Sequence, residues 1–309
     1  MYKKPVFNSV RTSTLFQPFR DKNAGLWLVV LAALLWSSSG VFIKVITLDP
    51  LPLAGYRSLL GGVALLPFIR WRQVQLNRVF GVAAVAFTLT SLTFTLATRW
   101  TAAANAIALQ STAPAWVFVI FCIHNRQIPW NLAPPLLLSL AGVVAFLLEP
   151  VAGVSFQGNL MGLVSGVFFA LTMYFTPLVK QSSISLVAQL NLFAGVALVL
   201  IDPGAYHPQD LTLSQWAALL YLGVVQIGMA YVFYTIGARL ISPTQAAMLT
   251  LLEPVFNPIW VFWVVGEVPS SFAFVGEGLV LSGIVADALL RRYLARKAMR
   301  AISPPPGAG

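Results

Sequence analysis

Long apolar stretches recur along this 309-residue chain, and they constrain its fold more than any other feature. A helix rises about 1.5 Å per residue, so about 20 apolar residues cross the roughly 30 Å hydrocarbon core of a bilayer. The stretches lie at 26–48, 51–69, 79–98, 102–123, 132–149, 158–180, 183–201, 213–237, 242–265 and 272–292. Because they are continuously apolar and do not alternate with polar residues, they are typical of helices and not of barrel strands. The sequence therefore predicts an all-α integral membrane protein with ten transmembrane helices.

The composition argues against an ordinary soluble fold. Hydrophobic residues make up 58% of the chain and charged residues only 9%, against about 25% charged in a typical soluble domain. The connections are too short to hold a separate soluble domain. The first apolar stretch is too long, and begins too far into the chain, for a cleaved signal peptide, so we expect no cleavage.

The basic residues are distributed unevenly between the two sides of the expected helices. With residues 1–24 in the cytoplasm, sixteen of the nineteen Lys and Arg residues fall on the cytoplasmic side, and only Arg99 lies in an outside loop. Five of the nine acidic residues fall outside: Asp49, Glu149, Asp202, Asp210 and Glu267. Positive residues stay on the cytoplasmic side, so we expect a protein of the cell membrane, the inner membrane of a bacterium, with cytoplasmic tails at 1–24 and 293–309. The distribution argues against a nucleic acid partner as the reason for the net charge of +10, and it is compatible with basic tails that bind acidic lipid.

The two halves of the chain resemble each other. When the second half is shifted back so that Arg239 falls on Arg99, several polar and proline positions coincide without a gap. The further matches are Asn105 with Gln245, Pro114 with Pro254 and Pro129 with Pro269, and earlier Gly25–Trp36 corresponds loosely to Gly158–Phe169. Each unit, 25–150 and 156–292, then holds five helices, and an odd number makes the second unit enter the membrane from the opposite side. Such inverted repeats are the architecture of many secondary transporters.

Several motifs carry a family resemblance. They are Leu35-Trp36-Ser37-Ser38-Ser39-Gly40 with Lys44, Tyr56-Arg57, Ala104-Asn105-Ala106 with Pro114, the run from Ala246 to Val255 that contains Glu253-Pro254, Gly266-Glu267, and Gly283. On these residues the chain resembles the EamA-type branch of the drug/metabolite transporter superfamily, over roughly residues 25–292. The resemblance implies ten helices in two five-helix units around a central cavity, and export of metabolites such as amino acids. The sequence departs from the family after its fourth helix, where Arg126-Gln127 stands in place of the usual Gly-Glu.

Glu253 is the sharpest candidate for a functional residue. It lies about eleven residues into the stretch 242–265, near mid-depth, where a charged side chain costs roughly 2.5–3.5 kcal/mol on insertion scales. Helical spacing puts Thr250, Glu253, Asn257 and Trp260 on one face, which we expect to look at the cavity. The alternative is a structural glutamate that is hydrogen-bonded to a neighbouring helix. The resemblance strengthens this alternative, because Glu-Pro is shared by family members with different cargoes.

Other polar side chains inside the expected helices complete the candidate pathway. Arg57 is expected to face the interior, because a guanidinium is always charged and benefits from a fixed partner. Lys44 is expected to reach the interface, with Asp49 as a possible partner. The expected pathway residues are Trp36, Ser37, Arg57, Gln110, Gln226, Tyr234, Thr250, Glu253, Asn257 and Trp260. Helix packing is the alternative for the stripe that contains Ser37. Two further stripes are expected to pack helices, namely the hydroxyl residues Thr88, Ser91, Thr95 and Thr98 and the glycines Gly158, Gly162 and Gly166.

Three classes of function compete. A secondary carrier of a small solute fits the inverted repeat and the buried charge. An intramembrane enzyme lacks its residues: no histidine is embedded, there is no pair of mid-depth aspartates, and the His-Glu-x-x-His and Walker lysine motifs are missing. A membrane assembly protein has little use for the repeat. With Cys122 alone and two scattered histidines, His124 and His207, we expect no metal site and no cofactor.

The charges of the expected helices favour a neutral or zwitterionic cargo. A phosphorylated or nucleotide-linked solute needs fixed positive charge near mid-membrane. The second half has no Lys or Arg inside its spans, and the first half offers only Lys44 and Arg57, both toward the outer side. We therefore expect an exporter of amino acids or similar metabolites, with Glu253 meeting an ammonium group, in a monomer or homodimer. A carrier of phosphorylated solutes is the alternative.

Overall fold

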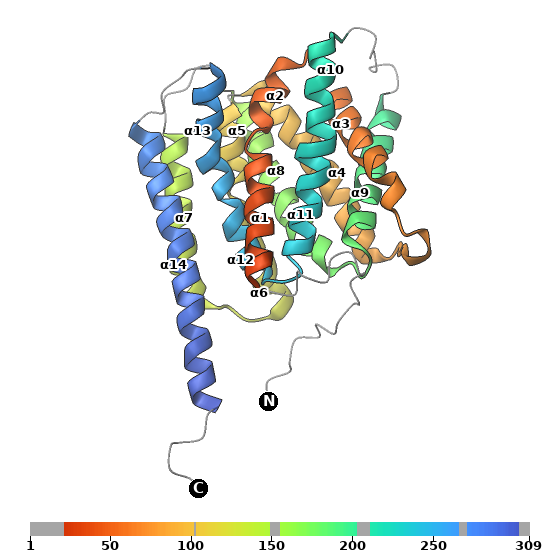
Figure 1. The fold of residues 1–309 in the computed structure, drawn as a ribbon. Coiled ribbons are helices and arrows are strands. Elements are labelled where there is room, and N and C mark those ends of the chain that lie inside the picture. The colour runs from red at the N-terminus through yellow and green to blue at the C-terminus, as the bar shows by residue number, and fades with distance from the viewer. Residues whose placement is uncertain (1–21, 102, 149–154, 203–210, 266–270, 303–309) are drawn as a thin grey trace.

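The computed structural model of the chain describes residues 22–101, 103–148, 155–202, 211–265 and 271–302. These five ranges form a bundle of helices joined by turns, without a strand in any of them (Figure 1). The first half comprises α1 (Lys22–Trp36), α2 (Ser39–Val45), α3 (Pro50–Leu65), α4 (Arg78–Trp100), α5 (Ala103–Gln110), α6 (Ala113–Asn125) and α7 (Ala133–Leu147). The second half comprises α8 (Phe156–Phe175), the 3-10 helix η5 (Thr176–Leu178), α9 (Ser183–Ile201), α10 (Leu213–Leu220), the π-helix η8 (Tyr221–Met229), α11 (Ala230–Gly237), α12 (Pro243–Thr250), α13 (Leu252–Val265) and α14 (Ser271–Ile302).

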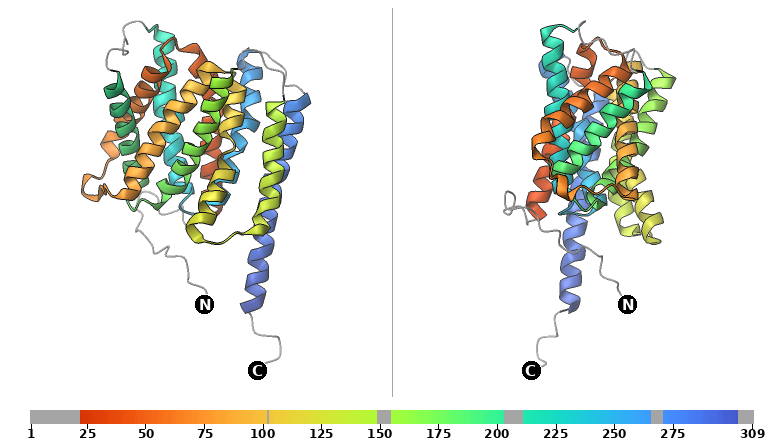
Figure 2. Two further views of the ribbon diagram at one scale, coloured as in Figure 1. Left: turned by 180° about the vertical axis from the view of Figure 1, so that it is seen from behind. Right: turned by 90° about the vertical axis from the view of Figure 1, so that its right-hand side faces the viewer.

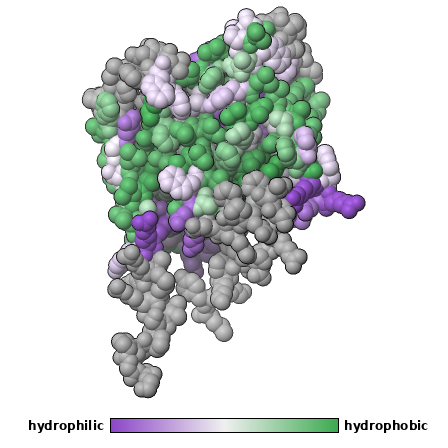
Figure 3. Space-filling model, in the orientation of Figure 1, coloured by the Kyte–Doolittle hydropathy of each residue, from purple (hydrophilic) through white to green (hydrophobic). Residues whose placement is uncertain are grey.

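Seven helices in the described ranges are long and apolar enough to cross a membrane. They are Lys22–Val45, Pro50–Phe68, Arg78–Trp100, Asn105–Asn125, Phe156–Leu178, Ser183–Ile201 and Leu213–Gly237. A shorter apolar helix, Trp130–Ala145, occupies an eighth expected stretch, and the last two stretches are helical as α12 with α13 and as α14. On the face in Figure 3, apolar residues cover the middle of the molecule and hydrophilic residues gather at its lower end. The chain is therefore an all-helical, multi-pass membrane protein.

Side chains are distributed as a lipid environment requires. Large apolar residues such as Trp27, Leu137 and Phe193 are exposed, whereas many serine, threonine and amide side chains are buried between helices. Glycines on α8 let its neighbours approach closely, since a Cβ atom on Gly158 would lie 2.7 Å from Thr101 and one on Gly162 would lie 2.9 Å from Leu109. The glycine stripe therefore packs within the chain, as the sequence predicts.

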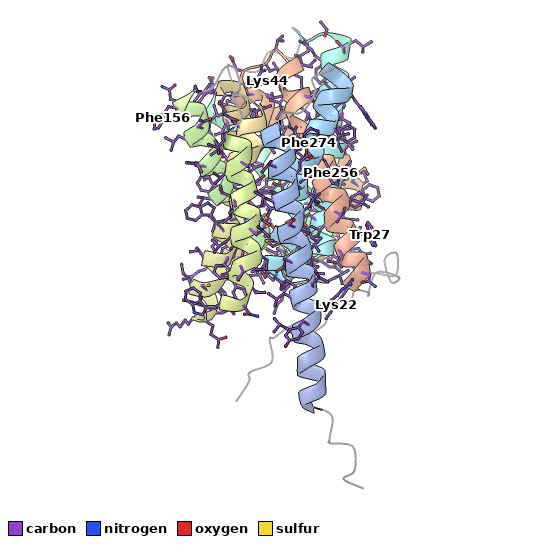
Figure 4. All side chains as sticks on the ribbon, turned by 90° about the vertical axis from the view of Figure 1, so that its left-hand side faces the viewer. Lys22, Trp27, Lys44, Phe156, Phe256 and Phe274 are labelled. Atoms are coloured by element: carbon purple, nitrogen blue, oxygen red, sulfur yellow. The ribbon has the colours of Figure 1, made fainter. Side chains whose placement is uncertain are left out.

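The most extensive helix contacts join the two halves of the chain. α4 packs along α8, α3 along α9, α1 along α11, and α7 along α14; the last pair stands at one side of the bundle (Figures 1 and 2). In Figure 4, Lys22 at the start of α1 lies toward one end of the bundle, whereas Phe156 at the start of α8 lies toward the other end, where Lys44 also lies. The first helices of the two halves thus run in opposite directions.

Two arginines that coincide when the halves are aligned make equivalent contacts. The guanidinium of Arg99 donates to the carbonyl oxygens of Ile46 and Leu48. The guanidinium of Arg239 donates to those of Val179 and Gln181, each at 2.7 Å. When Gly158 is aligned with Gly25, Val179 falls on Ile46 and Gln181 falls on Leu48, so the accepting carbonyls also correspond. Burial lowers the pKa of Arg239 to about 10, so this guanidinium stays charged at neutral pH.

The C-terminal helix extends into the expected tail. α14 runs to Ile302 through residues that favour a helix, such as alanine, lysine, arginine and methionine. Other expectations lie outside the described residues: the basic tail residues of 1–21, the loop acids Glu149, Asp210 and Glu267, and also Gly266, Pro269 and His207.

Candidate functional site

A small cavity of about 30 Å³ lies among α1, α3, α4, α5, α8, η8, α11 and α13. Its lining residues are Trp36, Arg57, Phe87, Thr90, Ser91, Phe94, Gln110, Phe169, Gln226, Ile227, Tyr231 and Glu253. A volume of this size suits one or two water molecules, so the bundle is closed around its polar centre in this conformation.

Interrupted helices bring polar residues to this cavity. The interruptions fall between Trp36 and Ser39, between Gln110 and Ala113, and at Leu251, just before Glu253. Gln226 lies in the π-helix η8. Irregular backbone at membrane depth is tolerated where protein or a cavity surrounds it, because the freed backbone groups need partners.

The helices expected over 26–48, 102–123 and 242–265 are present, and each is interrupted at one of these points. In the first, the hydroxyls of Ser37 and Ser38 donate to the carbonyls three residues earlier, at 2.7 and 2.8 Å, and so compete with the helical pattern. In the other two, Pro114 and Pro254 follow the interruption, and proline has no N–H to continue the ladder of the preceding turn.

Two buried charged side chains line the cavity. Arg57 on α3 is 3% exposed and Glu253 on α13 is 4% exposed. Both residues are described, and their charged atoms do not form an ion pair with each other. The guanidinium of Arg57 donates instead to the carbonyl and hydroxyl oxygens of Ser91, at 3.0 and 3.2 Å. Glu253 lies in the first turn of α13, where the helix dipole favours a carboxylate.

Aromatic rings surround the charged groups. The ring of Trp36 lies 4.8 Å from that of Tyr231, 5.3 Å from that of Phe169 and 5.5 Å from that of Tyr234. The ring of Phe87 lies 4.7 Å from that of Tyr231. Such pairs stabilise their own arrangement by about 0.5–1.5 kcal/mol each. The cavity thus combines one acidic and one basic side chain with an aromatic lining.

Some polar atoms at the cavity have no partner among the described residues. These buried atoms are Nε1 of Trp36, Nε of Arg57 and Oε1 of Gln226. The amide of Gln110, by contrast, donates to the hydroxyl of Ser165 at 2.6 Å. Since buried polar atoms normally have a partner, these three are available to a bound molecule.

The structure brings five of the ten predicted pathway residues to the cavity: Trp36, Arg57, Gln110, Gln226 and Glu253. Three more, Ser37, Tyr234 and Trp260, lie next to the cavity and form hydrogen bonds there. The hydroxyl of Tyr234 donates to the carbonyl of Met173 at 3.1 Å, and Nε1 of Trp260 donates to the hydroxyl of Ser37 at 2.7 Å.

The other two predicted residues lie on either side of Glu253. Asn257 is buried against α2, with its Oδ1 3.8 Å from where a Cβ atom on Gly40 would lie. Thr250 donates to the carbonyl of Ala247 at 2.8 Å and does not line the cavity. Thr250 and Glu253, expected on one helical face, lie on two helices that the interruption at Leu251 separates.

Helix α4 contributes most of the lining that sequence reasoning missed. Phe87, Thr90 and Phe94 were not expected there, and Ser91 was assigned to helix packing. The hydroxyl stripe was a usable signal for Ser91. A phenylalanine that faces a cavity cannot be told from one that faces lipid by composition alone. Lys44 is exposed at the end of α2, where its ammonium donates to the carbonyl of Thr101 at 3.1 Å and not to the expected partner, Asp49.

Comparison with known proteins decides the family. The model of the EamA-like transporter family matches this chain twice, over residues 23–148 and 156–286. The chain belongs to the EamA-like transporter family. Two proteins of Archaeoglobus fulgidus, each described as an uncharacterized transporter, are 27% and 26% identical over 275 and 268 residues. These alignments cover 83% and 86% of this chain and 94% and 97% of the relatives.

A crystal structure described only as that of a protein is similar to this EamA-like transporter in fold. The TM-score is 0.74 at 18% identity, over 89% of this chain and 99% of the other, and this likeness concerns the fold alone. The family match confirms the resemblance expected from the motifs. Among the described residues of this EamA-like transporter, no three His, Cys, Asp or Glu side chains group as they would around a metal ion.

Proposed function

We propose that this EamA-like transporter is a secondary carrier that exports amino acids or similar zwitterionic metabolites. The observation that carries the proposal is the cavity in which Arg57 and Glu253 are both buried and are not paired with each other. A buried charge is costly unless it is paired and hydrogen-bonded. A zwitterion supplies both partners at once, a carboxylate for Arg57 and an ammonium group for Glu253.

The buried polar atoms without a partner also suit a zwitterion. Nε of Arg57 and Nε1 of Trp36 are donors, which suit a carboxylate, whereas Oε1 of Gln226 is an acceptor, which suits an ammonium group. The rings of Phe87, Phe169 and Trp36 offer apolar surroundings to the rest of the solute. The closed cavity would have to widen to admit it, as alternating access requires.

A carrier of phosphorylated or nucleotide-linked solutes fits the cavity less well. A phosphate carries more than one negative charge and demands several cationic partners. Arg57 is the one Lys or Arg in the described lining, and it faces Glu253 in the same cavity. Lys44 is engaged at the exposed end of α2.

The proposal includes ten transmembrane helices in two inverted units, 25–150 and 156–292. The two family matches, the equivalent contacts of Arg99 and Arg239 and the opposite directions of α1 and α8 support this arrangement (Figure 4). The helix interruptions at 111 and 251 support it too, because they coincide when Arg239 is aligned with Arg99. Two inverted units can exchange their tilts and so expose one central site to each side in turn. We infer a location in the cell membrane, with both termini cytoplasmic, for a monomer or homodimer.

Counterflow in proteoliposomes tests this function. Wild-type protein should exchange a labelled apolar amino acid saturably, whereas Arg57→Gln and Glu253→Gln should lose exchange. Asp202→Asn is the matched control, because Asp202 is exposed at the end of α9 and away from the cavity. Melting temperatures close to that of the wild type would establish that the inactive variants fold.

Solute derivatives make the test sharper. The amide of the amino acid lacks the carboxylate, and its N-acetyl form lacks the ammonium group, so each should compete at least about tenfold less well. Equal competition by all three forms would contradict recognition of a zwitterion. Tight exchange of sugar phosphates without amino-acid flux would establish the alternative cargo. If Glu253→Gln does not fold, Glu253 is structural.

A further inference from the structure

A second hollow, unrelated to the polar cavity, lies on the outside of the bundle between α4 and α8. These helices run side by side on the face seen from behind in Figure 2. The groove has a volume of about 310 Å³ and is lined by Gly81, Val82, Val85, Ala86, Phe168 and Leu171, which are all apolar. A Cβ atom on Gly81 would meet nothing within 4 Å, and Val85 is 51% exposed. The groove therefore opens directly toward lipid.

Positive charge flanks one end of this groove. Arg78, the first residue of α4, is exposed and lies three and four residues before Gly81 and Val82, hence on the same face of the helix. The axial distance from Arg78 to Gly81 is only about 5 Å. On the other wall, α8 continues through η5, which contacts α4, to the exposed Lys180. Neither cationic group has a hydrogen bond or ion pair with another residue that the structure describes.

We propose that this groove binds one anionic phospholipid, with an acyl chain along Gly81, Val82 and Val85 and the phosphate at Arg78 and Lys180. An acyl chain fills an apolar gap that water does not wet, and Arg78 lies about one turn further out, where a headgroup belongs. Basic positions between transmembrane helices on the cytoplasmic side are suited to anionic headgroups.

A second copy of the chain is a poorer occupant. It would bring its own basic residues against Arg78, and the acid described near this end, Asp287, is buried and paired with Arg291 at 2.7 Å. The charge of the groove is therefore complementary to a phosphate and not to itself.

The groove and the polar cavity share a wall. The hydroxyl of Thr90, which lines the cavity, donates at 2.7 Å to the carbonyl of Ala86, which lines the groove. The hydroxyls of Thr90 and Thr172 lie 3.2 Å apart across the seam, and the neighbouring residues Phe168 and Phe169 face the groove and the cavity. A lipid in the groove thus covers the seam between α4 and α8 that closes the cavity on this side.

Native mass spectrometry of the delipidated, full-length protein tests the proposal, with phosphatidylglycerol and phosphatidylcholine of the same acyl chains as probes. Wild-type protein should retain one phosphatidylglycerol per chain in preference to phosphatidylcholine. Gly81→Leu fills the groove and should abolish retention of both lipids. Arg78→Gln should lower the preference for phosphatidylglycerol about fivefold, since a basic residue near a membrane contributes about 1 kcal/mol toward an anionic lipid.

Matched controls come from α14. Gly278 also has open space around a Cβ atom, and Arg292 is also exposed, so Gly278→Leu and Arg292→Gln should leave lipid retention unchanged. Equal retention of the two lipids by the wild type, or full retention by Gly81→Leu, would overturn the proposal. So would a lipid-free dimer that Gly81→Leu converts to a monomer, because the occupant is then a second copy. Binding is measured without transport, so the outcome is independent of the cargo.

Discussion

Replacing Arg239 by alanine should lower the stability of the fold by about 3 kcal/mol. Its guanidinium makes two 2.7 Å hydrogen bonds to carbonyl oxygens that follow η5, and a bond to a charged group contributes about 1.5–3 kcal/mol. We use the lower value for each of the two bonds, about 3 kcal/mol in total. The lower value applies because the carbonyl of Val179 also accepts the N–H of Gln181 at 3.0 Å and keeps that partner in the variant. The carbonyl of Gln181 loses the guanidinium that it accepts.

The assay is thermal unfolding of the purified protein in detergent, at one heating rate. About 3 kcal/mol corresponds to a fall in Tm of about 6–12 °C for a chain of this size class. Lysine keeps the charge without the forked pair of donors, so the Tm of Arg239→Lys should lie about halfway between those of the wild type and Arg239→Ala. Arg292→Ala, on an exposed arginine, is the control and should change Tm little.

The equivalent arginine of the first half extends the test. Arg99→Ala should also destabilise, because its guanidinium bridges two carbonyls in the same way. The two sites lie in different halves and share no partner, so the losses should add in the double variant. A fall in Tm of less than about 2 °C for Arg239→Ala would refute the reasoning that these hydrogen bonds stabilise each half of the fold.

Three further outcomes follow from the packing and the charge distribution. Tyr234→Phe removes a bond to a buried carbonyl on α8 and should cost about 1–2 kcal/mol in the same melting assay; an unchanged Tm would contradict this. Gly61→Ala puts a Cβ atom 2.6 Å from a carbonyl oxygen of η8 and should lower the stability by about 1–3 kcal/mol. Gly278→Ala, in open space, is the control and should leave the stability unchanged or raise it slightly. Similar changes in Tm for the two variants would argue against close packing at Gly61. A cysteine at Asp49 should react with an impermeant reagent from outside the cell and one at Gln75 should not, and the reverse pattern would overturn the orientation.

The site could be anticipated only in part. Buried charge and mid-membrane amides singled out Arg57, Glu253, Gln110 and Gln226, because polar groups in lipid are costly and so are informative wherever they occur. Thr250 was included for its spacing from Glu253, which presumed a continuous helix. The contribution of α4 was missed, since Phe87 or Phe94 satisfies hydrocarbon and cavity equally well. Such ambiguity is inherent to apolar residues in a membrane.

The sequence by itself determined the environment, the helical fold and the family of this protein. A chain with 9% charged residues is suited to hydrocarbon, where each backbone N–H and C=O needs a partner within the protein. Continuously apolar stretches meet this need as helices, so their length and composition are sufficient to predict the helical fold. Only the tertiary structure decided which polar faces meet. Helix packing in lipid depends on shape complementarity between small residues such as Gly61 and Gly158 and on a few hydrogen bonds, and not on burial of apolar surface. The arginine contacts with distant carbonyls and the groove beside Gly81 arise from that packing, which no periodicity in the sequence encodes.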